Sequence, residues 1–120
     1  MVEKIGDISL EIINTLNLNI PAGTAVYISK SNHRHMNNRH PWEYAKYHNR
    51  LPEIVSNPDY VGINSSDGSL EFIKVFSKYI KIAVRIANDG EYYIRSMYEV
   101  GKSRVENSVK TGQLKLLTKP

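Results

Sequence analysis

The chain of 120 residues contains no cysteine, which excludes disulfide bonds, thiol catalysis and thiolate metal sites. It has no run of about 18 apolar residues, as a membrane-spanning helix requires, and no apolar signal-peptide core at its start. It also lacks a glycine-rich phosphate loop, a G-x-S-x-G elbow, an HExxH motif and paired carboxylates. We therefore expect a soluble, cytoplasmic protein that is not an NTPase, an α/β-hydrolase or a zincin.

Composition and charge indicate a single globular domain, residues 1–120, with a polyanionic partner. Hydrophobic residues make up 41% and charged residues 23% of the chain, which is the ordinary globular range, and the length fits one core better than two. The net charge of +4 is unevenly placed, because residues 30–50 and residues 101–120 each carry +4. Clustered lysine and arginine gain from counterion release on a phosphate backbone; a solvated basic surface is the alternative.

The first half of the chain is predicted to be mainly helical. Apolar residues recur at helical spacing from Ile8 to Leu16, and the β-rich segment Thr24–Ile28 follows as a short strand or an extended entry. Proline disfavours helical geometry in the residue before it. Pro41 is therefore expected to divide the next helical stretch into two short helices, with His40 at the corner.

The second half is predicted to form an antiparallel sheet, followed by a basic helix at Gly101–Val109. Alternation of apolar and polar residues between turn residues indicates four strands: Tyr60–Asn64, Leu70–Phe76, Ile80–Ala87 and Tyr92–Val100. The predicted fold class is α+β, with amino-terminal helices packed on a four-stranded antiparallel sheet and a carboxy-terminal basic helix.

A two-residue turn at Asp89–Gly90 predicts the register of the last two strands, in which Ala87 faces Tyr92, Arg85 faces Ile94, Ala83 faces Ser96 and Lys81 faces Tyr98. One face then carries two cations and two hydroxyls: Lys81, Arg85, Ser96 and Tyr98. Small residues between them leave room for a phosphate; a solvated polar face is the alternative. A three-residue turn would invert the parity and bury Ser96, and the two-residue turn leaves Arg95 on the apolar face without an explanation.

The stretch from His33 to Tyr44 has the residue types of a catalytic site. It contains three of the four histidines, two arginines and the only tryptophan. RNA cleavage without a metal needs a base for the 2′-hydroxyl proton, an acid for the 5′-oxygen and cations at the phosphate. Imidazoles titrate near neutral pH, so His35 and His40 are the candidate acid and base. Guanidinium groups bind phosphate oxygens, so Arg34 and Arg39 are candidate substrate contacts.

Two other interpretations of these histidines stay open. His35 and His40 are five residues apart and share no helix face, so both reach the sheet only if the chain turns at Pro41; otherwise they cap helices or lie in solvent. A zinc site that includes His33 is a weaker alternative, because no carboxylate or cysteine accompanies the histidines at the usual ligand spacing.

A set of short segments carries a family resemblance, in this order along the chain: Thr24–Ser29, His35, Arg39–His40, Leu51–Ile54, Asn57–Tyr60, Phe72–Lys74 and Ile94–Tyr98. The ordered set resembles phage-encoded nucleases of the barnase–EndoU–colicin–RelE (BECR) superfamily. The resemblance implies the same α+β fold and a metal-independent cleavage of RNA that leaves a cyclic phosphate and needs no cofactor. It implies acid/base roles for His35 and His40. It further implies phosphate contacts at Lys74 and Arg85, and orienting hydroxyls on Ser96 and Tyr98.

We therefore predict an endoribonuclease of phage or toxin type that cleaves RNA by transesterification through the 2′-hydroxyl. The expected catalytic residues are His35, His40, Ser96 and Tyr98, and the expected substrate contacts are Arg34, Arg39, Lys74, Lys81 and Arg85. RNA, with tRNA as one candidate, and an inhibitor or immunity protein are the expected partners. The alternatives are a non-catalytic nucleic-acid- or protein-binding module of phage or mobile-element origin, and an interaction protein whose basic tail binds an acidic inhibitor.

Overall fold

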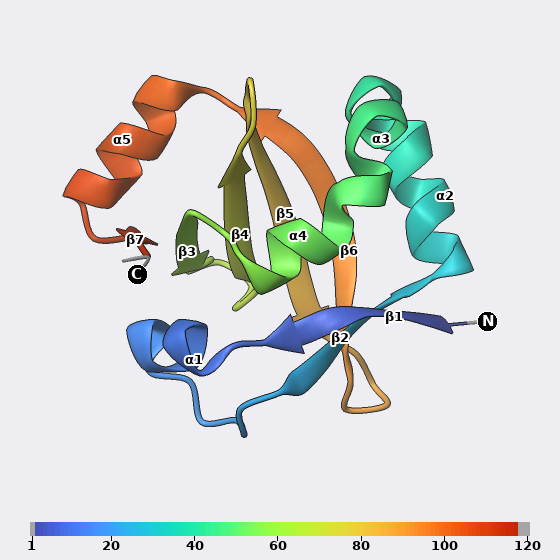
Figure 1. Ribbon diagram of the computed structural model, residues 1–120, viewed down its shortest axis with the longest axis horizontal. Coiled ribbons are helices and arrows are strands. Elements are labelled where there is room, and N and C mark those ends of the chain that lie inside the picture. Colours follow the sequence, from blue (N-terminus) through green and yellow to red (C-terminus); the bar gives the residue numbers. More distant parts are fainter. Residues whose placement is uncertain (1, 118–120) are drawn as a thin grey trace.

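The computed structural model describes residues 2–117, and these form one seven-stranded sheet (Figure 1). The strand order is β1-β2-β6-β5-β4-β3-β7. The strands are β1 (Val2–Ile8), β2 (Thr24–Ser29), β3 (Tyr60–Ile63), β4 (Leu70–Val75), β5 (Tyr79–Ile86), β6 (Tyr92–Val100) and β7 (Leu114–Leu116). Neighbouring strands are antiparallel except β2 and β6, which are parallel.

The predicted sheet is wrong in size and type, because the sheet is mixed and has seven strands rather than four antiparallel ones. The described chain also begins with a strand, not with a helix. The four predicted strands correspond to β3–β6, which form the antiparallel centre of an α+β fold. The additional strands join segments that are distant in sequence, and strand formation of that kind depends on tertiary context more than on local propensity.

The first strand escapes prediction because it contains a β-bulge. The register of β1 against β2 shifts between Lys4 and Gly6, which makes Ile5 the extra residue. The bulge breaks the period of two, so that Ile5 and Ile8 both contact the core although they are three residues apart. Gly6 lies close to α4, where an added Cβ would be 3.3 Å from a methyl carbon of Val55.

Two layers of helices surround the sheet. The helices are α1 (Leu10–Leu16), α2 (Lys30–Arg39), α3 (Pro41–Tyr47), the 3₁₀ helix η1 (His48–Arg50), α4 (Leu51–Ser56) and α5 (Lys102–Lys110). The main core joins α1 and α4 to one sheet face through Ile12, Ile54 and Phe72, whereas Val105 of α5 packs on Ile73 of the other face. Among residues 2–117 no helix combines the length and apolar character needed to cross a bilayer.

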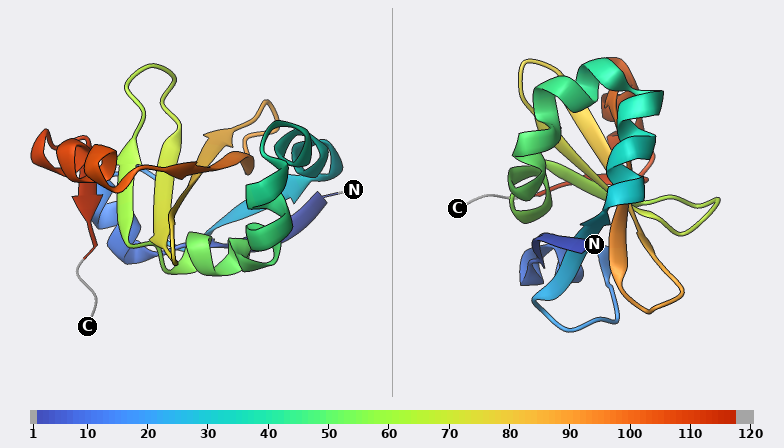
Figure 2. Two further views of the ribbon diagram at one scale, coloured as in Figure 1. Left: turned by 90° about the horizontal axis from the view of Figure 1, so that it is seen from above. Right: turned by 90° about the vertical axis from the view of Figure 1, so that its right-hand side faces the viewer.

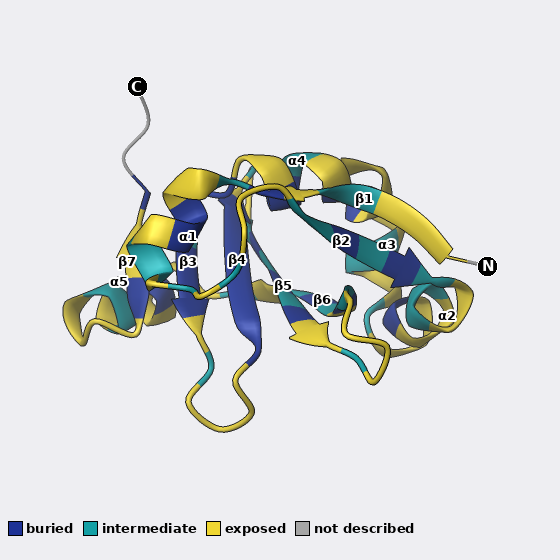
Figure 3. Cartoon of the chain, turned by 90° about the horizontal axis from the view of Figure 1, so that it is seen from below, coloured by how far each residue is buried: buried dark blue, intermediate teal, exposed yellow. Residues whose placement is uncertain are grey.

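The second sheet face is open between its flanking helices. Figure 2 shows α2 and α5 at opposite ends of the molecule, with α4 on one side and the β3–β4 loop projecting from the other. Figure 3 shows that β4 is buried along most of its length while this loop is exposed. The predicted carboxy-terminal basic helix is α5, and Lys119 of the basic tail lies outside the described residues.

The predicted register of the β5–β6 hairpin is confirmed in its open half, in the pairs Lys81–Tyr98 and Ala83–Ser96. Nearer the turn it is wrong, because Arg85 pairs with Tyr93 rather than with Ile94. The register shifts after Ala83, and Arg95 is the extra residue of the resulting bulge. The bulge leaves Arg95 exposed, so it does not lie on the apolar face as the predicted register required.

Replacing Gly62 by alanine is expected to detach β7 from β3. An added Cβ would be 2.5 Å from the carbonyl oxygen of Gln113 and 2.9 Å from Cδ2 of Leu114. Overpacking of this kind costs about 1–3 kcal/mol, measurable as a lower midpoint in urea unfolding. Gly101→Ala is the matched control, because its Cβ meets nothing within 4 Å and its φ is −73°. Equal stability of the two variants would contradict this packing.

Candidate functional site

The corner predicted at Pro41 is present between two helices that lie beside β6. α2 ends at Arg39, α3 begins at Pro41, and His40 between them has the non-helical angles φ −140° and ψ 68°. The His40 N–H donates to the carbonyl of Met36 at 2.9 Å, which closes the last turn of α2. Proline at the first position of α3 lacks only an N–H that would have no intrahelical partner. The corner therefore follows directly from local sequence.

The corner and the polar face of β6 enclose one pocket of about 230 Å³, here called the histidine pocket. Its lining residues are His35, Met36, Arg39, His40, Ser96 and Tyr98. All four predicted catalytic residues and one predicted phosphate contact thus surround a single cavity. Met36 is buried in the core and anchors α2 against the sheet, whereas His35 and Arg39 are exposed at the rim.

His40 is held on two sides. Its ring stacks on Tyr98, with centroids 5.4 Å apart and planes 26° from parallel. Its Nδ1 lies 3.8 Å from Oε2 of Glu43, and the same oxygen accepts the backbone N–H of Glu99 at 3.3 Å. Sequence reasoning did not select Glu43, although a carboxylate three residues after a histidine in the first turn of a helix was the available signal.

Glu71, a second residue that the sequence did not point to, lies on β4 on the polar face of the sheet. Its Oε2 accepts a hydrogen bond from Lys81 Nζ at 2.9 Å, and the Lys81 ammonium lies 5.2 Å from the centre of the Tyr98 ring. Burial on its own lowers the pKa of Lys81, but the interactions with Tyr98 and Glu71 outweigh burial and raise this pKa above its ordinary value. The only sequence signal for Glu71 was an acidic residue inside an apolar strand.

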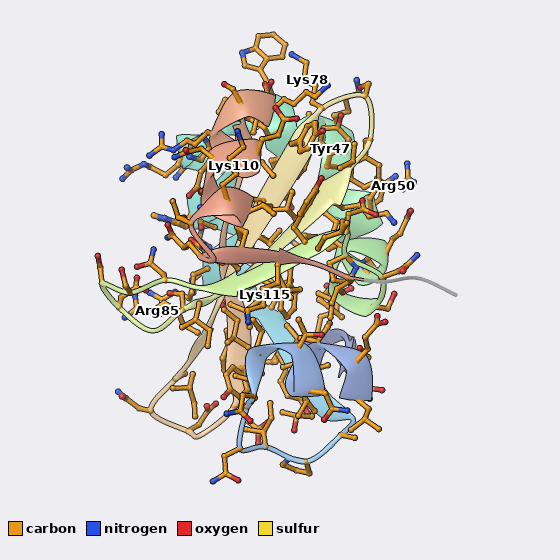
Figure 4. All side chains as sticks on the ribbon, turned by 90° about the vertical axis from the view of Figure 1, so that its left-hand side faces the viewer. Tyr47, Arg50, Lys78, Arg85, Lys110 and Lys115 are labelled. Atoms are coloured by element: carbon orange, nitrogen blue, oxygen red, sulfur yellow. The ribbon has the colours of Figure 1, made fainter. Side chains whose placement is uncertain are left out.

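Three of the predicted substrate contacts and the tryptophan of the His33–Tyr44 stretch lie outside the histidine pocket. Arg34 is exposed on α2, and Trp42 on α3 is 85% exposed. Arg85 lies beside the β3–β4 loop (Figure 4), where it lowers the pKa of Asp67 less than the hydrogen bonds from Ser69 do. Lys81 contributes to the pocket only through Tyr98.

Lys74 lies on the opposite sheet face. It is 9% exposed and donates a hydrogen bond to the backbone carbonyl of Asn57 at 2.9 Å, with Asp59 at 3.9 Å. These contacts join β4 to the segment that precedes β3. The register of β4, in which Ile73 rather than Lys74 pairs with Lys81, therefore directs Lys74 away from the histidine pocket.

His33 is separated from the other two histidines of α2 and its corner. Its Nδ1 lies 2.8 Å from the Tyr44 hydroxyl, and its Nε2 lies 3.4 Å from Glu3 of β1. Among residues 2–117 no group of three histidine, cysteine, aspartate or glutamate side chains is placed to hold a metal ion. The three histidines of the zinc alternative thus do not come together.

Comparison with known proteins assigns the chain to a family. Residues 3–107 match the sequence profile described as phage-Barnase-EndoU-ColicinE5/D-RelE like nuclease3. No curated protein and no solved structure matches the chain. The matched range runs from β1 into α5 and includes every residue of the histidine pocket. The chain belongs to the phage-Barnase-EndoU-ColicinE5/D-RelE like nuclease family 3.

Proposed function

We propose that this nuclease is a metal-independent endoribonuclease that cleaves RNA in the histidine pocket by transesterification. The observation that supports the proposal most is the presence of two imidazoles, one guanidinium and two hydroxyls around a single cavity. Metal-free RNA cleavage needs these groups, because protons must move at two oxygens while charge develops on the phosphate. Membership of a nuclease family supplies the phosphodiester substrate.

His40 acts as the general base in this mechanism. A carboxylate near one imidazole nitrogen stabilises the imidazolium that forms when the other nitrogen accepts a proton. Glu43 is the carboxylate near Nδ1, so Nε2 takes the proton from the ribose 2′-hydroxyl. The resulting 2′-oxygen attacks the phosphorus. The stacked Tyr98 ring restrains the His40 imidazole while this occurs.

His35 acts as the general acid from the exposed wall of the pocket. The bond between phosphorus and the 5′-oxygen breaks, and the His35 imidazolium gives that oxygen its proton. The products are a 2′,3′-cyclic phosphate and a free 5′-hydroxyl, so the proton removed by His40 is balanced by the one that His35 donates. Arg39 neutralises charge on the equatorial oxygens, and Ser96 orients the phosphate. Arg34 contacts a neighbouring phosphate, and Lys74 has no role in this mechanism.

The proposal is tested with the purified protein and a labelled RNA oligonucleotide in the presence of EDTA. We expect cleavage to continue in EDTA and to produce cyclic-phosphate ends, detected by mass spectrometry. An oligonucleotide of the same sequence with 2′-deoxyribose at the cleaved position should stay intact at that position, because the attacking oxygen is missing. Cleavage of this deoxy substrate, or inhibition of RNA cleavage by EDTA, would overturn the mechanism. RNA that is bound but never cut would favour the non-catalytic binding module.

A further inference from the structure

A second pocket lies on the same open sheet face, towards α5. It has a volume of about 250 Å³ and is named here the sheet pocket. Its polar lining residues include Asn64, Glu71, Lys81, Tyr98, Arg104 and Gln113. Pockets for drug-sized molecules have volumes of about 300–1,000 Å³, so the sheet pocket fits a group no larger than a single nucleotide.

The sheet pocket and the histidine pocket share one lining residue. Tyr98 lines both cavities, with His40 stacked on its ring and the Lys81 ammonium 5.2 Å from the ring centre. α2 and α5 flank the open face at its two ends (Figure 2). An RNA strand whose scissile phosphate lies between His35 and His40 therefore crosses Tyr98 to reach the sheet pocket.

The floor of the sheet pocket contains an acceptor that the fold itself does not use. Glu71 is 4% exposed, and both of its hydrogen bonds, from Lys81 at 2.9 Å and Asn64 at 3.4 Å, end on Oε2. No residue between 2 and 117 donates a hydrogen bond to its Oε1, and this oxygen is not one of the fully buried unpartnered atoms, so solvent in the pocket reaches it. A buried ion pair loses hydration at a cost that apolar residues of equal size would not incur. A charged acceptor that is held rigidly by this pair and is reached from the pocket suits recognition of a ligand N–H.

We infer that the sheet pocket is a second nucleotide subsite, in which Glu71 Oε1 accepts a hydrogen bond from the edge of the nucleobase next to the cleaved phosphate. Lys81 lies beside Glu71 and donates to an acceptor on the same base edge, which carries donors and acceptors side by side. Arg104 of α5 lines the pocket, is exposed and binds the phosphate that follows. This inference rests on the proposed function in taking RNA as the ligand and in placing its scissile phosphate in the histidine pocket.

The test measures binding rather than cleavage, with His40→Ala protein and four fluorescein-labelled RNA hexamers of A, C, G or U. Fluorescence anisotropy gives the dissociation constants. We expect one hexamer to bind more tightly than the others, and Glu71→Gln to reduce this preference about tenfold, since an amide cannot replace a charged acceptor. Thermal unfolding of Glu71→Gln checks that the buried pair is not simply disrupted.

Arg104→Gln provides a test that leaves the buried pair intact, and Lys110→Gln is its control. Both changes remove one charge from α5, but Lys110 is not among the residues that line the sheet pocket. We expect Arg104→Gln to weaken binding about tenfold and Lys110→Gln to weaken it only through the general loss of charge. Equal effects of the two, or equal affinity for all four hexamers, would overturn the subsite. Selective binding by a wild-type protein that never cuts RNA would keep the subsite and overturn the proposed function.

Discussion

Replacing His40 by alanine is expected to lower the rate of RNA cleavage by about 10²- to 10⁴-fold, the contribution of one acid/base group, while RNA affinity stays within a few-fold. The imidazole removes a proton in the mechanism, whereas the phosphate is held by Arg39 and Arg34. Single-turnover cleavage and anisotropy measure the two quantities separately. His35→Ala should act in the same direction, and the double variant should fall short of the product of the single effects because both residues serve one step.

His48→Ala is the matched control for these variants. His48 is exposed, stacks on Tyr44 with centroids 4.8 Å apart and donates from Nδ1 to the Tyr44 carbonyl, but it does not line the histidine pocket. The cleavage rate of the His48→Ala variant should equal that of the wild-type protein. Full activity of the His40→Ala variant would contradict the proposed mechanism. A loss of activity accompanied by an equal loss of RNA affinity would instead assign His40 to binding.

Replacing Lys81 by methionine is expected to lower the free energy of unfolding by about 3–5 kcal/mol. Methionine keeps most of the length of the side chain but leaves the carboxylate of Glu71, whose side chain is 6% exposed, without its cation at 2.9 Å. The effect is large for a domain with about 5–15 kcal/mol of total stability. Urea unfolding at neutral pH measures it directly. A change below 1 kcal/mol would show that solvent compensates the carboxylate.

The double variant Lys81→Met with Glu71→Leu tests whether the ion pair itself contributes to the free energy of unfolding. Removing both charges should restore stability to the wild-type level or above, because the desolvation cost disappears with them. The pKa of Lys81 is raised above its ordinary value of 10.5, so the ammonium is favoured in the folded state. Its stabilisation is fully present below about pH 10.5 and is lost as pH rises through the folded pKa. The difference between wild type and Lys81→Met should therefore stay constant near neutral pH and shrink in strong alkali.

The corner at His40 could be predicted from sequence because its cause is local. Pro41 acts on the backbone of the residue before it, and the six strand residues from Ile80 to Arg85 alternate regularly. Together these features place His40, Ser96 and Tyr98 on elements that the structure confirms, around one pocket. The pairing near the hairpin turn was predicted wrongly because a bulge at Arg95 changes the register, and the only local signal of this bulge was a charged residue on the predicted apolar face.

The sequence by itself determined the α+β character, the antiparallel centre from β3 to β6 and the helix corner, since each depends on the backbone preferences of neighbouring residues. Only the tertiary structure decided that β2 pairs in parallel with β6, that Glu43 lies near His40 and that Lys74 faces away from the pocket. These outcomes depend on which distant segments bury one another's apolar faces. That choice is made by the energy of the whole core, not by any short stretch of the chain.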